Sequence, residues 1–275
     1  MKRSSLLKHP EKTLKLFKQA PSIFLALTAF VLGCFTGMQV ESPAVVAETT
    51  SVKVVSALKP GILLPQKPLQ IERPGYTLEY DGRTRNAQWV YECLTSENLE
   101  GKIERENYSF QEDPKIPRML QNTLADFKGS GFDRGHLAPA ADHKSSADAM
   151  RDTFYLSNMS PQVPQFNRGY WVKLEKYVRD LTRSCKLVHV TTGPLFLPNL
   201  EEHGKKYVKY QVIGKNNVAV PTHFFKVIMR ETTTGSMKSE AYLLPNRQIA
   251  KETPLSQFQT TVQDIEKVSG LLFQQ

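Results

Sequence analysis

Cysteine is scarce in this sequence. Cys34, Cys93 and Cys185 are the only three among 275 residues, and neither a Cys-x-x-Cys pair nor a Cys/His cluster occurs. A disulfide framework requires several cysteine pairs, and a structural zinc site requires clustered thiolates or imidazoles, so both classes are disfavoured. We expect free, buried thiols, and a bridge between Cys93 and Cys185 is the alternative.

Internal repeats and low-complexity tracts are also absent. The hydrophobic content of 40% and charged content of 23% are ordinary for a globular protein, and the length suffices for one large domain or two small ones. Acidic residues are the minority, at 27 against 36 Lys and Arg, which gives a formal net charge of +9. This excess fits a polyanionic partner but does not identify one.

The longest uncharged apolar run, residues 22–38, has only 17 residues, at the short end for a membrane span of about 20. A strongly basic stretch precedes it, so a secretory signal, a mitochondrial presequence and a signal anchor are all open. We interpret 1–20 as a basic targeting segment, 21–38 as a hydrophobic anchor or signal, and 39–70 as a proline-containing linker. Residues 71–275 then form the globular domain.

The stretch with the most chemical content is DRGHLAPA, residues 133–140, followed by Asn167 and Glu175. A histidine has an unperturbed pKa of about 6.5 and can deprotonate water near neutral pH. Mg²⁺ keeps most of its waters and needs few protein oxygens, so one asparagine carbonyl can anchor it. The arginine of the motif offers a fork of donors suited to phosphate oxygens. Together these residues favour phosphodiester hydrolysis.

Each residue also has a structural interpretation. A lone histidine is most often a satisfied structural side chain, and an asparagine before a helix is most often an N-cap. An Asp-Arg pair is usually a surface ion pair. Only the combination favours a nuclease.

The combination resembles the signature of the DNA/RNA non-specific endonucleases with a ββα-metal site. The similarity covers residues 75–273 and is carried by six separated blocks: GSGFDRGH (129–136), DTFYLSN (152–158), SPQVP (160–164), TGPLFLP (192–198), YVKYQVIGKN (207–216) and VAVPTHFFK (218–226). The resemblance implies an α+β fold of mixed or antiparallel sheets with packed helices.

Carried over residue by residue, the resemblance implies that His136 is the general base. Asn167 is the direct metal ligand, Glu175 binds the metal through water, and Asn158 positions the histidine or its water. The implied phosphate contacts are Arg134, Arg179 and an upstream arginine, either Arg83 or Arg85. The implied cofactor is Mg²⁺, with Mn²⁺ as the alternative, and a homodimer is expected.

The sequence departs from the family pattern in one place. Relatives commonly read Leu-Ala-Ala-Ala with Asn-His after the catalytic histidine, whereas this chain has Pro139 and Asp142. Asp142 therefore adds a negative charge close to the site. His143 follows it, and we expect this histidine to have a surface role rather than to face substrate.

Hydrophobic spacing predicts the main elements. We expect strands at 76–80 and 88–94 joined as a hairpin, a strand at the motif, and further strands at 154–157, 187–191, 207–213, 222–229 and 240–244. Helices are expected at 145–151, 171–181 and 254–270, with a short one within 116–127. On an ideal helix Asn167 and Glu175 lie about 80° apart, so either the helix is irregular around Gly169 or Glu175 acts through water. We favour the water-mediated role.

The expected activity is metal-dependent hydrolysis of DNA and RNA that leaves 5′-phosphate and 3′-hydroxyl ends. The rival interpretations are an inactive nucleic-acid-binding protein with the same fold and a phosphodiesterase for small nucleotides. Mitochondrial members of the family favour the mitochondrial intermembrane space, with inner-membrane association through the N-terminal hydrophobic segment. Export to a bacterial periplasm or secretion is the alternative.

Overall fold

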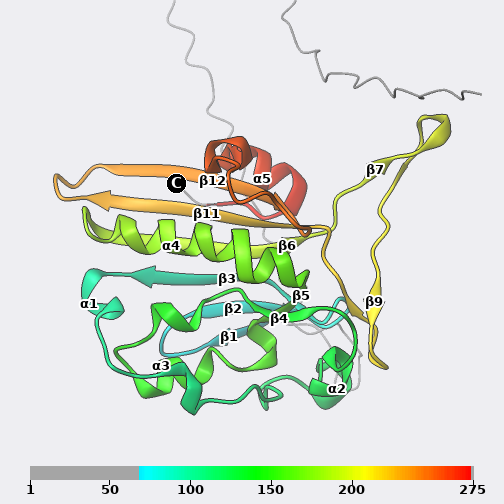
Figure 1. Ribbon diagram of the computed structural model, residues 1–275, viewed down its shortest axis with the longest axis horizontal. Coiled ribbons are helices and arrows are strands. Elements are labelled where there is room, and N and C mark those ends of the chain that lie inside the picture. The colour runs from blue at the N-terminus through cyan, green and yellow to red at the C-terminus, as the bar shows by residue number, and fades with distance from the viewer. Residues whose placement is uncertain (1–67, 274–275) are drawn as a thin grey trace, which may run out of the picture. The chain divides into compact units, whose positions relative to one another are not determined.

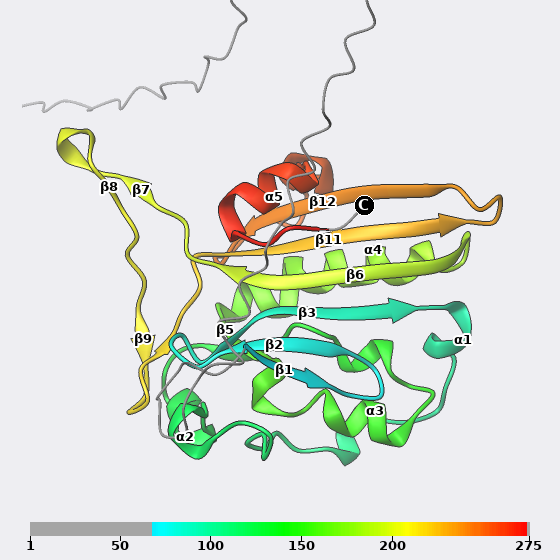
Figure 2. The same cartoon turned by 180° about the vertical axis from the view of Figure 1, so that it is seen from behind.

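The computed structural model describes residues 68–273, and a seven-stranded antiparallel sheet forms its centre (Figures 1 and 2). Every neighbouring pair in the sheet is antiparallel. In spatial order the strands are β1 (Leu69–Glu72), β2 (Thr77–Asp81), β3 (Asn86–Leu94), β6 (Cys185–Leu195), β11 (His223–Thr232), β12 (Met237–Pro245) and β13 (Gln259–Thr260). The hairpin predicted from 76–80 and 88–94 is confirmed as β2 and β3.

The two faces of the sheet are covered by different helices because side chains alternate along each strand. Phe224 and Ile228 of β11 belong to the main core, together with Trp171 and the buried face of helix α4 (Val172–Leu181). Phe225 and Val227 face the other way, toward helix α5 (Val262–Ser269). The predicted 171–181 helix is thus confirmed as an amphipathic helix packed on the sheet.

The motif forms a short separate ribbon beside this sheet. Strand β4 (Asp133–His136) pairs antiparallel with β5 (Met159–Gln162), and Gly135 lies opposite Ser160. A Cβ atom at Gly135 would collide with the side chain of the buried Gln162, so the packing of that side chain against β4 requires glycine here.

A π-helix, η6 (Phe166–Trp171), follows this ribbon and continues directly into α4. The helix is thus irregular around Gly169, which was one of the two alternatives left open by the spacing of Asn167 and Glu175. Phe166 and Trp171 are almost fully buried and pack against Phe224, which anchors the π-helix on the sheet. Motif strand, return strand and helix together give a ββα arrangement next to the large sheet.

Short elements complete the domain. The helix predicted at 145–151 is present, and Ser146 caps it by accepting a hydrogen bond from the Ala149 amide. The remaining α-helices and strands are α1 (Ser96–Leu99), α2 (Leu124–Phe127), α3 (Ala147–Asp152), β7 (Asn199–Leu200), β8 (Lys206–Tyr207), β9 (Val212–Ile213) and β10 (Val218–Ala219). The 3₁₀ turns are η2 (Arg105–Asn107), η3 (Arg118–Leu120), η4 (Ala140–Asp142), η5 (Leu156–Asn158), η7 (Glu202–Gly204) and η8 (Leu255–Phe258).

Two predicted strands are wrong. Residues 154–157 make only an isolated bridge from Tyr155 to Gln111 and then enter the 3₁₀ turn η5. Their backbone groups form hydrogen bonds with Gln111 and with neighbouring turn residues instead of with a second strand. Most of 207–213 runs along an exposed arm (Figure 1). Within it, β8 pairs with β7 and β9 pairs with β10, over two residues in each case. Its Tyr207, Val208 and Tyr210 are exposed, so the apolar composition reflects surface rather than core.

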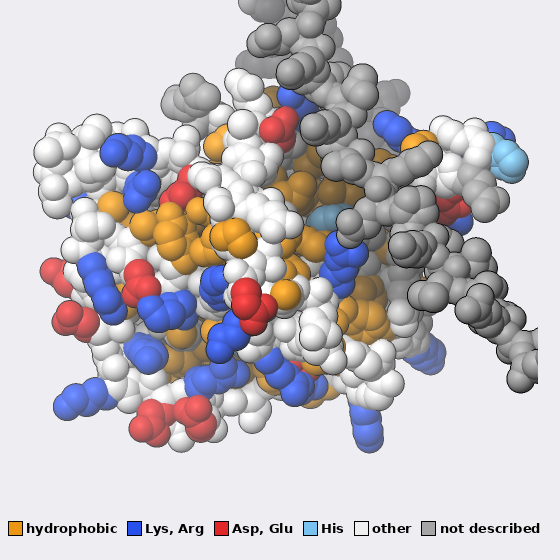
Figure 3. Space-filling view, turned by 45° about the horizontal axis from the view of Figure 1, so that its top comes forward, with side chains coloured by type: hydrophobic (Ala, Val, Ile, Leu, Met, Phe, Trp, Pro, Cys, Tyr) orange, Lys and Arg blue, Asp and Glu red, His pale blue; other side chains and the backbone are white. Residues whose placement is uncertain are grey.

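The α+β fold class is confirmed, and Cys93 and Cys185 are free thiols. The predicted targeting segment, anchor and most of the linker fall outside the described residues. Within 68–273, none of the helices is both long and apolar enough to cross a membrane. Figure 3 shows Lys and Arg side chains spread widely over one face of the molecule, in keeping with the basic composition.

Candidate active site

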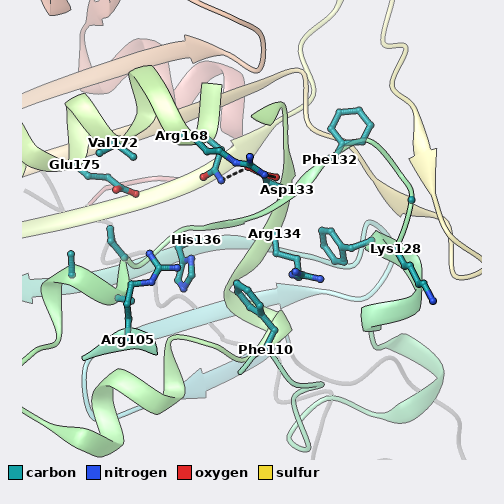
Figure 4. A pocket seen from close by; sticks show the side chains of 16 residues that line it. Arg105, Phe110, Lys128, Phe132, Asp133, Arg134, His136, Arg168, Val172 and Glu175 are labelled. Carbon is teal, nitrogen blue, oxygen red and sulfur yellow. Dashed lines mark hydrogen bonds and ion pairs between the residues drawn. The ribbon is translucent and has the colours of Figure 1, made fainter. Parts of the chain in front are cut away.

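A cavity of about 570 Å³ opens between the motif ribbon and the π-helix (Figure 4). Glu175 and Arg168 reach it from the helical side, while Arg105, Phe110 and His136 lie opposite. The full lining is Arg105, Phe110, Phe127, Lys128, Gly129, Phe132, Asp133, Arg134, His136, Pro139, Ala140, Ala141, Asn167, Arg168, Val172 and Glu175. Four of the residues predicted for the site, Arg134, His136, Asn167 and Glu175, thus share one cavity.

His136 ends strand β4 and is held from two directions. Its backbone carbonyl accepts a hydrogen bond from the Trp171 indole at 3.3 Å, and its ring packs edge-on against Phe154 at 5.3 Å between centroids. The ring Nε2 is buried and has no hydrogen-bond partner among the described residues. Burial, together with the nearby charge of Arg105, lowers the pKa of His136 to about 3. The imidazole is therefore neutral at cellular pH.

Asn158 lies behind the histidine rather than beside its ring. Its side chain is fully buried, accepts a hydrogen bond from the Ala138 amide at 2.9 Å, and donates to the carbonyls of Ala138 and Thr153. These bonds fix the backbone at Ala138, two residues beyond His136. Any influence of Asn158 on the position of the His136 ring is therefore transmitted through the backbone of residues 136–138.

Asn167 lies on the π-helix with its amide oriented by the motif. Its Nδ2 donates to Oδ2 of Asp133 at 2.8 Å, and Arg168 donates to both oxygens of the same carboxylate. Although burial alone would raise it, these hydrogen bonds lower the pKa of Asp133 below its ordinary value. The Asn167 Oδ1 atom makes no hydrogen bond within residues 68–273 and is free to act as an oxygen ligand.

Glu175 lies in the first turn of α4 and is 9% exposed. Burial raises the pKa of its carboxyl to about 8, and the buried ammonium of Lys226 opposes this shift. A divalent cation in the cavity would favour the charged carboxylate further.

The predicted arginines are not all in one place. Arg134 lines the cavity, and its guanidinium stacks over the Phe110 ring at 4.5 Å. Arg179 is one helical turn beyond Glu175, outside the cavity lining, and pairs with Asp142 at 2.8 Å. Arg83 is exposed and lines a different depression, while Arg85 donates to the Met119 carbonyl, so neither lines the cavity.

His143 is buried at 6% exposure, so the surface role expected for it is wrong. Its Nε2 lies 3.2 Å from a Glu92 oxygen in the interior. Although burial alone would lower it, Glu92 and Asp142 raise the pKa of His143.

Several lining residues were missed by the sequence reasoning. The cations Arg105, Lys128 and Arg168 and the aromatic rings Phe110 and Phe132 border the cavity. Lys128 and Phe132 flank the two glycines that precede the motif, a signal that could have suggested them. Arg105 and Phe110 come from an irregular segment whose pairing with the motif no local pattern reveals.

The residues present fit a sparsely coordinated divalent ion. Among the described residues, no group of three or more His, Cys, Asp or Glu is placed to hold a metal, so a carboxylate or histidine cage is not formed there. The free amide oxygen of Asn167 and the nearby Glu175 carboxylate are hard oxygen donors. One amide oxygen with water completing the shell is the type of site that Mg²⁺ accepts.

The ββα arrangement with a histidine at the end of the ribbon and an asparagine on the helix defines the class of ββα-metal nucleases. Comparison with known families agrees: residues 56–275 match the model described as DNA/RNA non-specific endonuclease. The chain belongs to this family.

Its relatives are nucleases. The chain is 54% identical over 201 residues to human endonuclease G, mitochondrial, covering 73% of this chain and 68% of that protein. It is 48% identical to nuclease C1 of Cunninghamella echinulata var. echinulata, covering 74% and 81%. A crystal structure of the EndoG/EndoGI complex matches with a TM-score of 0.74 and 43% identity, covering 76% of this chain and 87% of that one. The resemblance to mitochondrial endonuclease G within the family is confirmed.

Proposed function

We propose that this nuclease hydrolyses phosphodiester bonds in DNA and RNA with His136 as the general base and one Mg²⁺ anchored by Asn167. The observation that carries the proposal is the convergence of His136, Asn167 and Glu175 on one cavity from separate parts of the chain. Mn²⁺ is the alternative ion, since its ligand preference is similar.

Each residue has a defined task. The neutral His136 ring takes a proton from water, and Glu175 orients water next to the ion. Arg134 binds a phosphate oxygen through its fork of donors, and Arg179 does so from the next turn of α4. The ion, when bound, stabilises negative charge on the phosphate and the departing 3′-oxygen. The products are then a 5′-phosphate and a 3′-hydroxyl end.

The rim of the cavity supports a polymeric substrate. Arg105 and Lys128 supply positive charge, and Phe132 offers a ring face on which a base can stack. Stacking and phosphate contacts carry little sequence information, so cleavage without base selectivity follows. The Lys and Arg side chains spread over the surface in Figure 3 add to the attraction of a polyanion.

The proposal extends to a compartment and an assembly. Because human endonuclease G is named as mitochondrial, we assign the protein to the mitochondrion. Within it we propose the intermembrane space. Residues 21–38 would attach it to the inner membrane, and the nuclease domain would form a homodimer. The mass of the mature N-terminus in isolated organelles tests this assignment, because an exported protein would be cut near residues 44–47 instead.

Plasmid nicking tests the activity. Wild-type protein should cleave duplex DNA and single-stranded RNA with Mg²⁺ and should stop when the metal is chelated. His136→Ala and Asn167→Ala should each lose on the order of 10²-fold or more in turnover, while Asn98→Ala, a surface change, should not.

Two outcomes would contradict the proposal. Binding of DNA without metal-dependent cleavage would identify an inactive nucleic-acid-binding protein. Faster hydrolysis of mononucleotide diesters than of long duplexes would identify a small-nucleotide phosphodiesterase.

A further inference from the structure

Asp142 joins the motif loop to the helix that carries Glu175. It ends the 3₁₀ turn η4, six residues after His136, and is 2% exposed. Its Oδ1 accepts a hydrogen bond from Nη1 of Arg179 at 2.8 Å. The ion pair therefore ties two segments that are far apart in the sequence and that both border the catalytic cavity.

Arg179 is placed for a second contact. It lies four residues after Glu175 in α4, so the two side chains lie on the same helical face. Within residues 68–273 its guanidinium makes no hydrogen bond except that to Asp142. A guanidinium has five donors in a rigid fork. The bond to Asp142 fixes one edge of that fork and leaves the other donors for an anionic ligand.

The surroundings of Asp142 make this pair hard to break. Burial and the neighbouring Glu92 carboxylate raise the pKa of Asp142 to about 6, while the Arg179 and His143 charges oppose the shift. A buried carboxylate that loses its cationic partner is strongly unfavourable, so the interior resists rotation of Arg179 away from Asp142. His143 is already paired with Glu92 and does not replace the guanidinium.

We propose that Asp142 is a positioning residue for phosphodiester cleavage, which holds one edge of the Arg179 guanidinium so that its free donors reach a substrate phosphate beside Glu175. The inference rests on the proposed phosphate contact of Arg179. Without the ion pair the long arginine side chain samples many rotamers, and only some of them bring its fork to the phosphate.

A double-mutant cycle tests the role. Asp142→Asn keeps the shape of the side chain but removes its charge, and it should lower kcat/KM for plasmid cleavage on the order of 10-fold. In an Arg179→Met background, the same change should alter kcat/KM by less than about 2-fold, because no guanidinium remains to be positioned. A merely structural role would give the same loss in both backgrounds.

The control is Asp148→Asn, which removes an exposed carboxylate that pairs with Arg151 at 2.7 Å and lies away from the cavity lining. It should cleave like the wild type. If Asp142→Asn does not fold by circular dichroism, Asp142→Ser gives the same comparison with a smaller neutral side chain.

Equal losses in both backgrounds, or wild-type cleavage by Asp142→Asn, would overturn the positioning role alone. A fully active Arg179→Met variant would refute the phosphate contact and this inference with it. A wild-type protein that does not cleave would refute the proposed function itself.

Discussion

Asn167 and Glu175 line the same cavity although eight residues separate them. The π-helix η6 accounts for this alignment, because a π turn takes roughly 4.4 residues and an α turn 3.6. One turn of each spans eight residues, so the two side chains lie along one face, two turns apart. A continuous α-helix would leave them about 80° apart. The extra residue in the helix is thus part of the site.

Inserting one alanine after Gly169 should rotate Asn167 by about 100° relative to Glu175, because each residue of an α-helix turns the chain by about that angle. The expected result is a loss on the order of 10²-fold in Mg²⁺-dependent cleavage, because the oxygen donor no longer faces the cavity. Plasmid cleavage across a Mg²⁺ titration measures the effect.

Gly169→Ala is the matched control. A Cβ at this position meets nothing within 4 Å, and the residue count of the helix is unchanged. This variant should cleave like the wild type. An insertion variant that folds and keeps full activity would show that the site does not require the two residues to be aligned.

The acid stability of the protein should depend on His136. The folded pKa of about 3 lies well below the unfolded value of about 6.5, so between these values the unfolded chain binds a proton that the native chain does not. The stabilising contribution is complete above pH 6.5 and is lost as the pH falls toward 3. His136→Gln should therefore lose less stability than the wild type between pH 6.5 and 4.5, measured as urea midpoints.

His189→Gln provides the comparison, since His189 lies partly exposed on β6 and bonds to the Tyr91 hydroxyl. It should keep the acid sensitivity of the wild type. If the urea midpoints of His136→Gln and the wild type fall in parallel as the pH is lowered, His136 is not held neutral by its surroundings.

Asn158 should matter for stability as well as for activity. Asn158→Ala leaves the amide and carbonyl of Ala138 and the carbonyl of Thr153 buried without this partner. The free energy of unfolding should fall by about 3 kcal/mol, measured by chemical denaturation. Asn98→Ala, at an exposed site with one long hydrogen bond, should change it by less than about 0.5 kcal/mol. A similar small change for Asn158→Ala would argue against its role in holding the loop.

The sequence predicted the parts of the site that local chemistry encodes. Helix α4 follows from hydrophobic spacing. Strand β4, His136, Asn167 and Glu175 follow from the motif and its resemblance. The spacing of Asn167 and Glu175 even indicated an irregular helix or a water-mediated contact, and the helix is irregular.

Long-range partners were not predictable in this way. The burial of His143 depends on Glu92, which is 51 positions earlier and whose side chain points inward only because of the register of β3 in the sheet. Residues 154–157 have strand-like composition, yet their backbone bonds to Gln111 and they form no ladder. Such contacts are decided by tertiary packing, which local propensity does not contain.

Salt dependence should reveal the cations at the rim. If Arg105 and Lys128 each neutralise one phosphate, replacing either with alanine should reduce the slope of log kcat/KM against log salt concentration by about 1. Lys238→Ala removes an exposed cation on β12 that does not line the cavity, and it should leave the slope unchanged. Activity on long duplex DNA between 50 and 200 mM salt, roughly the range in which such contacts are screened, gives the slopes. Unchanged slopes in both rim variants would place the substrate path elsewhere, because counterion release depends on the number of phosphates contacted and not on the net charge of the protein.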